Sequence, residues 1–578
     1  MKRGLTLILV ILSPLARTAE SWVEESNANT AWVMGEQARF QPESFASLGI
    51  ESVDEDISDL QANLYQRSQQ ATLELIAGLE QRRATTENPR VIQDIDILLK
   101  SLREQYHTAE LNHKYLLPYY NLSQNLYFGF RSLLDPRNDP ARYPAALVRL
   151  KKYTGQVEGT RPLTDLAKER TVERFDQPGL LGPYRFELEK DLENVARYRA
   201  GMEQVFLESG LEGWQEDLAL LDLQLDEYAA WLTEQMLPRA RDSHLLPEEL
   251  YADNLKNFGV DMEPRQLIRA AQLGFAEIQL QMRSIAQQIA EKNGYPSADY
   301  RFVLKELGKE QMPEETVMTV YRERLRDLET IIRDNELVSL PDRPAVIRLA
   351  TEAESAAVPA PFMSPPQLIG NTGQPGEFVL VTTNPTDESG EPMTDFGSPA
   401  STWSLTAHEA RPGHEMQFAA MLESGVSQAR AIYAFNSANV EGWGLYAEAI
   451  VQQYLPLGGQ LFGLRSRLMR AARAFIDPML NLGLITPEQA MDFIISDVGL
   501  SRPMAQQEVD RYTFRAPGQA TSYYYGYMNL MALRTEVELR MRERFNQLKY
   551  HDFLLAQGLL PPEILRQAVL DEFVAPAE

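Results

Sequence analysis

The chain has 578 residues, of which 44% are hydrophobic and 24% charged, a composition typical of a folded globular protein rather than a disordered or membrane-embedded one. Its formal net charge of −26 argues against nucleic acid or an anionic lipid surface as a partner, because both need clustered Lys and Arg. The chain contains no cysteine, which excludes disulfides, thiolate zinc sites and cysteine nucleophiles, and we expect no lipid anchor on an N-terminal Cys. Any metal must therefore be held by histidines and carboxylates.

The N-terminal segment 1–19 has the features of a signal peptide. Lys2 and Arg3 form a basic start, residues 4–16 are largely apolar, and small residues follow at the expected cleavage region. The apolar run is too short to span a bilayer comfortably, although retention as an N-terminal anchor is the alternative. No later segment is apolar enough to cross a membrane. We therefore expect an exported protein, periplasmic or secreted, whose mature chain is not inserted into a membrane.

Helical periodicity dominates the region that follows, which we predict to form a helical N-terminal lobe over residues 20–350. Its segments are rich in Leu, Ala, Glu, Gln and Arg, with apolar residues returning every three or four positions. The predicted helices are 56–83, 91–115, 185–208, 212–236, 264–292 and 313–335.

Residues 351–578 are predicted to form a catalytic lobe. Its first part, 357–401, is crowded with Pro, Gly, Ser and Thr and contains the run EFVLVTTN at 377–384, the clearest strand of the chain. We therefore expect a small β-sheet near the functional site of a mainly α protein. The predicted helices of this lobe are 402–424, 427–455, 460–481, 487–496, 503–511, 520–546, 550–557 and 561–573.

The segment TAHEARPGHEMQ contains two of the six histidines of the chain. His408, Glu409 and His414 resemble the zinc-peptidase pattern in which two His flank a Glu on one helix, but there the His lie four positions apart and share a face. Here the spacing is six. On an unbroken helix this separates the two side chains by about 120° in azimuth and about 9 Å along the axis, too far for one ion at about 2 Å from each nitrogen.

The residues before His414 suggest how the two histidines converge. Pro412 cannot donate a hydrogen bond to the carbonyl of His408, which its ring also crowds, and Gly413 can adopt backbone angles closed to other residues. We therefore predict that the helix breaks after Arg411 and restarts at His414, which brings the second imidazole back to the first. The alternative is a Pro-Gly helix end with two incidental histidines.

A helix predicted over 433–450 carries two glutamates among small and apolar residues. Glu441 and Glu448 share one face, and their apolar surroundings are not those of a solvated stripe of carboxylates. A glutamate one helical hairpin downstream of a two-His helix completes two-His-one-Glu zinc sites. We predict that His408, His414 and Glu441 bind one Zn²⁺ ion, with Glu448 as an acceptor that orients a ligating histidine.

A third segment, 511–534, combines arginines with a cluster of tyrosines. In a zinc hydrolase a Tyr hydroxyl or an Arg beside the metal can stabilise the oxyanion of the tetrahedral intermediate. For most of these tyrosines, aromatic packing between helices is the alternative. Arg511, Arg515 or Arg534 could also hold a substrate carboxylate, and the sequence does not select among them. The tyrosines are Tyr523, Tyr524, Tyr525 and Tyr527.

These motifs resemble a bacterial family, the domain-of-unknown-function family 885, within the gluzincin-like metallopeptidases. The likeness spans roughly residues 30–575, although before about 245 it rests on helical character alone. The family is similar in architecture to thimet oligopeptidase and angiotensin-converting enzyme, which implies a large helical two-lobed clam-shell that closes over a deep cleft. The matching segments are HEARPGH at 408–414 with Gln417, EGWGLYAE at 441–448, RYTFRAPGQATSYYYG at 511–526 and HDFLLAQGLLPPEIL at 551–565.

The resemblance also implies roles for individual residues. It makes His408, His414 and Glu441 the zinc ligands, Glu409 the general base and Tyr523 the donor to the oxyanion. Gln417 and Arg534 are further candidates for contact with the ligands or the substrate. The strand at 377–384 would lie along the cleft and pair with an extended peptide.

We therefore expect a zinc-dependent hydrolase, most of all a peptidase that uses zinc-activated water and Glu409 as base to cleave small or extended peptides. One alternative is a non-catalytic periplasmic protein that binds a peptide or another ligand. The Glu beside the first His disfavours it, because binding alone has no need of a base. The other alternative is a zinc hydrolase of an ester or a non-peptide amide.

Overall fold

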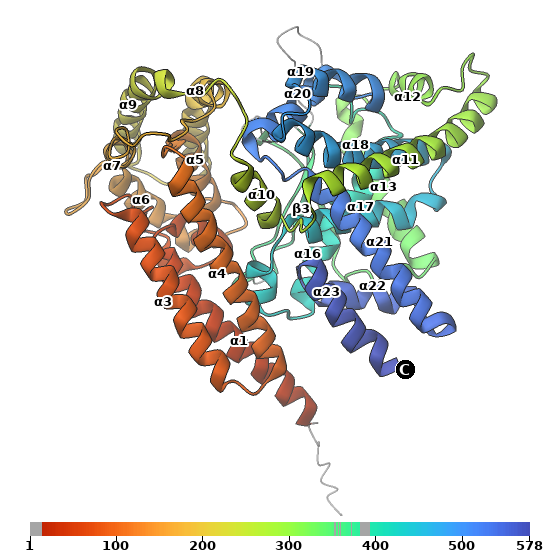
Figure 1. Ribbon diagram of the computed structural model, residues 1–578, viewed down its shortest axis with the longest axis horizontal. Helices are drawn as coiled ribbons and strands as arrows, with labels where there is room; N and C mark the ends of the chain where they lie inside the picture. The colour runs from red at the N-terminus through yellow and green to blue at the C-terminus, as the bar shows by residue number, and fades with distance from the viewer. Residues whose placement is uncertain are drawn as a thin grey trace, which may run out of the picture.

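The computed structural model describes residues 14–577 apart from 352–353, 356–357, 359, 372 and 382–392, and it is mainly helical with one small sheet (Figure 1). This confirms the predicted fold class. Residues 1–13 of the predicted signal peptide lie outside the described residues, and the first helix begins inside that segment, at Pro14. Among the residues described, no helix is both long and apolar enough to cross a membrane.

The N-terminal helices form one side of the molecule in Figure 1, with α10 between them and the C-terminal half. Side chains of α5 to α9 build an apolar core of their own, which includes Phe130, Leu150 and Phe206. The helices are α1 (Pro14–Ala38), α2 (Pro42–Leu48), α3 (Leu64–Thr85), α4 (Pro89–Tyr115), α5 (Leu122–Leu133), α6 (Pro144–Tyr153), α7 (Leu163–Val172), α8 (Arg185–Ser209), α9 (Gln215–Trp231) and α10 (Glu248–Asn257).

The C-terminal half has its own core, which unites helices on both sides of the strand region. Leu267 and Phe275 of α11 pack in one cluster with Leu468 and Phe475 of α18. Helices assigned from sequence to the N-terminal lobe thus share a core with helices of the predicted catalytic lobe. The helices are α11 (Pro264–Asn293), α12 (Tyr300–Gly308), α13 (Glu314–Asp334), α15 (Thr402–Glu409), α16 (His414–Glu423), α17 (Ser437–Val451), α18 (Leu457–Asn481), α19 (Pro487–Phe493), α20 (Arg502–Asp510), α21 (Thr521–Met541), α22 (Gln547–Ala556) and α23 (Pro562–Ala568).

Several predicted helices begin or end elsewhere. The helix expected from residue 56 begins only at Leu64, because Asn63 adopts a left-handed conformation with φ of 57° and interrupts the helical backbone. The region expected to form one helix over 427–455 is divided into a π-helical turn, Ala429–Tyr433, and α17, which begins at Ser437. The helix expected over 402–424 is divided into α15 and α16.

The sheet has three strands in the order β1-β3-β2, namely β1 (Val346–Leu349), β2 (Phe362–Ser364) and β3 (Glu377–Leu380). β1 is parallel to β3 and β2 is antiparallel to it, so β3 is the central strand. The predicted strand is confirmed as far as Leu380, and its residues 382–384 lie outside the described residues. The predicted pairing of this strand with a peptide is wrong over 377–379, because both edges of β3 are occupied there.

The sheet also supports the segment that joins α15 to α16. Phe378 and Leu380 of β3 lie in one buried cluster with Tyr321 of α13 and with Ala410, the residue that follows α15. The sheet therefore packs directly against the point at which the histidine-bearing helix is interrupted.

α17 and α21 cross at glycines, so that their main chains touch. A Cβ atom added to Gly526 would lie 1.9 Å from the carbonyl oxygen of Ala438 and 2.8 Å from the Cα of Gly442. No side chain fits at this crossing. The contact brings α21, which carries Tyr523, against α17, which carries Glu441.

We predict that Gly526→Ala destabilises the protein by about 1–3 kcal/mol, because the added methyl group meets backbone atoms that cannot move aside. The measurement is urea unfolding followed by circular dichroism. Gly463→Ala in α18 is the matched control, since no atom lies within 4 Å of its added Cβ, and it should leave stability unchanged or raise it by up to about 1 kcal/mol. Equal stability of the two variants would contradict the close crossing.

Candidate metal centre

The centre begins with the interruption between α15 and α16. α15 ends at Glu409, and Ala410 and Gly413 have non-helical ψ angles of −101° and −135° before α16 begins at His414. The Arg411–Pro412 peptide bond is cis. A Cβ atom on Gly413 would lie 1.8 Å from the carbonyl oxygen of His408, so only glycine fits. The predicted break and restart are confirmed, with α15 ending two residues earlier than expected.

Polar contacts hold this interruption in place. Arg411 and Glu415 are both buried, and Arg411 Nε donates to Glu415 Oε2 at 2.8 Å. The same guanidinium donates to Glu329 Oε1 of α13 at 2.7 Å and to the carbonyl of Arg343 at 2.7 Å. Trp443 Nε1 of α17 donates to the carbonyl of Pro412 at 3.0 Å. Hydrogen bonds to α13, α16, α17 and the main chain at Arg343 therefore hold the break in one conformation.

The interruption brings the two imidazoles to one carboxylate. His408 Nε2 and His414 Nε2 each lie 3.4 Å from Glu441 Oε2, and the two rings are nearly perpendicular with centroids 4.6 Å apart. One ligand atom from each residue lies within 4.8 Å of those of the other two. Two ligand atoms about 2.1 Å from a tetrahedral zinc ion are separated by about 3.4 Å. The spacing of these donor atoms fits a single zinc ion.

Gly444 of α17 lies directly against the two imidazoles. A Cβ atom there would lie 2.6 Å from His408 Cε1 and 2.9 Å from His414 Cε1. Any larger residue would push the imidazoles apart, so this glycine, one helical turn after Glu441, is required by their close approach.

Glu448 orients the first histidine. Its Oε1 accepts a hydrogen bond from His408 Nδ1 at 2.8 Å, and its Oε2 accepts one from the hydroxyl of Ser404. This hydrogen bond keeps a proton on Nδ1, so that Nε2, which faces Glu441, would be the atom offered to a metal ion. The structure places Glu448 against His408 as predicted, and the binding of a metal by His408 stays a prediction. His414 Nδ1 has no partner in the described part of the chain.

The electrostatics favour a cation. Burial acts to lower the pKa of His408, but Glu441 and Glu448 outweigh it and raise the pKa to about 9. Burial acts to raise the pKa of Glu441, but His408 and His414 hold it well below its usual range. Burial raises the pKa of Glu409. Three carboxylates around two imidazoles make a site in which a divalent ion would take the place of protons.

Glu409 and Tyr523 lie near the three predicted ligands, and their side-chain oxygen atoms make no hydrogen bond within the described residues. The Tyr523 ring lies 6.4 Å from the His408 ring, nearly parallel to it. Within the described residues neither the Glu409 carboxylate nor the Tyr523 hydroxyl makes a hydrogen bond or ion pair with the protein. Both groups are therefore free to act on a bound molecule.

Comparison with known proteins identifies the family. Residues 42–569 match the family described as "Bacterial protein of unknown function (DUF885)". The chain belongs to this family. No curated protein matches it.

Two solved structures share the fold of this DUF885 chain over nearly its whole length. One is from Shewanella oneidensis, at 18% identity and a TM-score of 0.74, with 95% of this chain and 100% of that chain covered. The other is from Colwellia psychrerythraea, at 18% identity and a TM-score of 0.76, with 95% and 98% covered. Both carry the name "putative lipoprotein".

Two predicted site residues are engaged elsewhere. Gln417 donates to Asn439 Oδ1 at 3.0 Å, which ties α16 to α17. Arg534 donates to Glu538 at 2.7 Å, to Gln547 at 2.9 Å and to the Tyr446 hydroxyl at 3.1 Å. Neither side chain makes a hydrogen bond to the three predicted ligands, and the Oε1 atom of Gln417 is buried without a partner in the described part of the chain.

Other residues at the centre were missed from the sequence. Ser404 and Gly444 carry signals too weak to notice alone, one being a serine four positions before His408 and the other a glycine in the middle of a helix. Arg411 and Glu415 form an i, i+4 pair that the motif itself displays. That pair could have been found, but not its burial or its link to Glu329.

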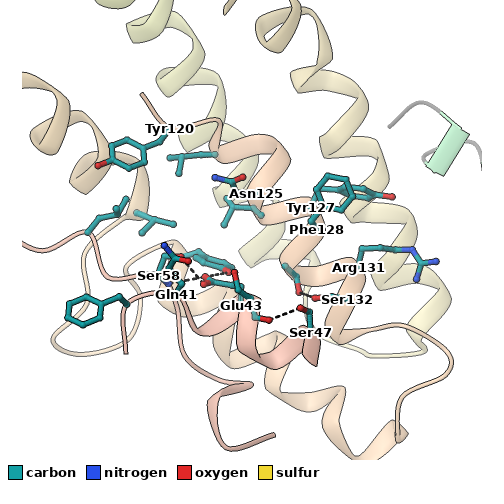
Figure 2. Close-up of a pocket in the computed structure, with 18 of the residues that line it drawn as sticks. Gln41, Glu43, Ser47, Ser58, Tyr120, Asn125, Tyr127, Phe128, Arg131 and Ser132 are labelled. Carbon is teal, nitrogen blue, oxygen red and sulfur yellow. Dashed lines mark hydrogen bonds between the residues drawn. The ribbon is translucent and has the colours of Figure 1, made fainter. Parts of the chain in front are cut away.

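A separate cavity of about 830 Å³ lies in the N-terminal half (Figure 2). Its labelled residues include Tyr120, Phe128 and Arg131, and none of the three predicted ligands lines it. Its charged groups already have partners, since Glu43 accepts from Ser58 and Arg131 pairs with Glu354 at 2.9 Å. This hollow is not the deep cleft expected over the metal centre.

We predict that Glu448→Gln lowers zinc affinity about 10- to 100-fold, because the neutral amide is a weaker acceptor for His408 Nδ1. The measurement is competition for zinc with a chromophoric chelator. Glu538→Gln, at an exposed carboxylate on α21, is the control and should not change affinity. Unchanged affinity in Glu448→Gln would show that this carboxylate does not tune the ligand.

Proposed function

We propose that the protein is a zinc-dependent hydrolase and, most specifically, a peptidase. The observation that carries the proposal is the convergence of His408 Nε2 and His414 Nε2 on one oxygen of Glu441, each at 3.4 Å. Histidines six positions apart meet in this way only because the chain is broken and held between them. A spacing that suits tetrahedral zinc, on three residues of the ligand types that zinc prefers, supports a metal site.

The residues around the three ligands supply the parts of a hydrolytic reaction. A zinc ion bound there would lower the pKa of a bound water from its high value in bulk water towards about 7. Glu409 accepts a proton from the attacking water and passes it to the leaving amine. The hydroxyl of Tyr523 donates a hydrogen bond to the oxyanion that forms on the scissile carbonyl. Glu448 holds His408 in the tautomer that leaves Nε2 free.

Glu409 also bears on the choice between catalysis and binding alone. Glu409 is half-buried and its carboxylate makes no hydrogen bond or ion pair within the described residues, which is unfavourable, and a binding protein would gain nothing from keeping such a group next to its metal. Hydrolysis needs such a group. This favours an enzyme over a non-catalytic binder, and the resemblance of the motifs to zinc peptidases favours peptide over ester substrates.

We place the protein outside the cytoplasm. The two similar structures are named as lipoproteins, a class of exported protein, which agrees with the signal-like segment 1–19 of this chain. The chain contains no cysteine, so we propose that it is exported without a lipid attached to an N-terminal cysteine.

The metal site is tested by elemental analysis of the purified protein. We expect one zinc ion per chain, and we expect His414→Ala to lose both the metal and activity because one of three ligands is removed. His107→Ala, at a side chain that is 60% exposed, is the control. Full zinc content in His414→Ala would show that the second histidine is not a ligand.

The base is tested by Glu409→Gln. We expect this variant to keep zinc but to hydrolyse peptides about 10²- to 10⁴-fold more slowly, because the amide cannot take a proton. Quenched peptides and a panel of esters, each with and without a chelator, give the rates. Glu423→Gln, at an exposed carboxylate on α16, is the control. Near wild-type turnover by Glu409→Gln would show that Glu409 is not the base. Chelator-sensitive hydrolysis of esters but not of peptides would change the proposed substrate from a peptide to an ester.

A further inference from the structure

Three arginines surround Tyr523. The guanidinium carbons of Arg473, Arg470 and Arg511 lie 4.5 Å, 5.9 Å and 6.0 Å from the centre of the Tyr523 ring. Two come from α18, and Arg511 begins a π-helical turn, Arg511–Arg515, that follows α20. In a chain with a net charge of −26, this is a concentration of positive charge next to the metal centre.

All three arginines lie near carboxylates, and two of them lie within 4 Å of one. Arg473 makes two hydrogen bonds of 2.6 Å to Glu508, which also accepts one from the Tyr512 hydroxyl. Arg470 Nη2 lies 3.9 Å from Glu448 Oε1, the carboxylate oxygen that accepts from His408. Both nearby carboxylates are therefore already in use.

Arg511 has no such partner. Within the described residues its side chain makes no hydrogen bond and no ion pair, and its Nη1 atom is fully buried. The residue as a whole is only partly buried, so part of Arg511 remains open to solvent. A buried donor without an acceptor is unfavourable in the free protein and becomes favourable when an anion binds.

The other two candidate arginines are already engaged. Arg515 is exposed, donates to Gln507 and lies 3.6 Å from Asp510. Arg534 is held by three acceptors on α21 and its neighbours. Of these three arginines only Arg511 is free to receive a ligand, a distinction that the sequence could not make.

We propose that Arg511 binds a carboxylate of the substrate close to the bond that is cut. This inference rests on the proposed peptidase function and adds a substrate class to it. A guanidinium offers two parallel N–H donors, which match the two oxygens of a carboxylate. The carboxylate is either the free C-terminus of a short peptide or an acidic side chain.

The geometry limits how far that carboxylate lies from the reacting bond. The ring contacts of Tyr523 with Arg511 and with His408 place the guanidinium carbon no more than about 12 Å from the His408 ring. An extended residue spans about 3.3–3.6 Å, so three or four residues cover this distance. The enzyme therefore cuts within about four residues of the bound carboxylate.

The test compares three short quenched peptides of one sequence, which end in a free carboxylate, in an amide, or in an amide with a Glu near the cut. We expect the wild-type protein to prefer a carboxylate-bearing peptide about 10- to 100-fold in kcat/KM. Arg511→Gln should lose this preference mainly through a higher KM, with a larger loss of kcat/KM on the carboxylate-bearing peptide than on the plain amide. Loss on the free-acid peptide identifies the C-terminus as the ligand, and loss on the Glu peptide identifies the side chain.

Matched variants separate this proposal from the function on which it rests. Arg515→Gln, four residues further along the same turn, should keep the preference. Arg511→Lys keeps the charge without the paired donors and should retain part of it, which provides a second measurement if Arg511→Gln folds poorly. Zinc content and thermal unfolding show whether each variant is intact.

Two results would overturn the inference while leaving the peptidase function standing. One is equal cleavage of all three peptides by the wild-type protein. The other is an equal loss on all three peptides in Arg511→Gln. A zinc-loaded wild-type protein that cleaves no peptide would instead overturn the peptidase function itself.

Discussion

One oxygen atom of Glu441 lies at the same distance, 3.4 Å, from the two Nε2 atoms of His408 and His414, and the rest of the site depends on this arrangement. It exists because the chain leaves the helical path for four residues and returns, which no regular helix allows at this spacing. Arg411 stabilises the detour by bonding to α13 and α16 at once. A buried ion pair adds little net stability but is costly to break, so its effect here is to keep the detour in one conformation.

Two residues, Glu448 and Tyr523, lie between the candidate metal centre and the three arginines near Tyr523. Glu448 lies between His408 and Arg470, and Tyr523 lies between His408 and Arg511. Carboxylates and guanidinium groups therefore both lie near Tyr523, in a setting where burial leaves little water to screen their charges.

Local chemistry determined what the sequence could predict. Pro412 and Gly413 indicated the break, and the apolar surroundings of Glu441 and Glu448 indicated buried carboxylates, because each signal lies within one turn of the residue that it describes. Long-range contacts gave no such signal. The sequence around Arg411 does not indicate that this residue pairs with Glu329. The run at 377–384 does not indicate that the strand it forms is paired on both edges. Short helices such as α6 and α12, with too few turns to show periodicity, were missed for a related reason.

The crossing of α17 and α21 at Gly442 and Gly526 has a consequence for how this family can diversify. Main-chain atoms, not side chains, set the separation between the helix of Glu441 and the helix of Tyr523. Replacements on other faces of α21 can alter the surroundings of the tyrosine without changing its distance from Glu441. Such a framework would let the residues lining this region vary while the spacing between the two helices stays the same.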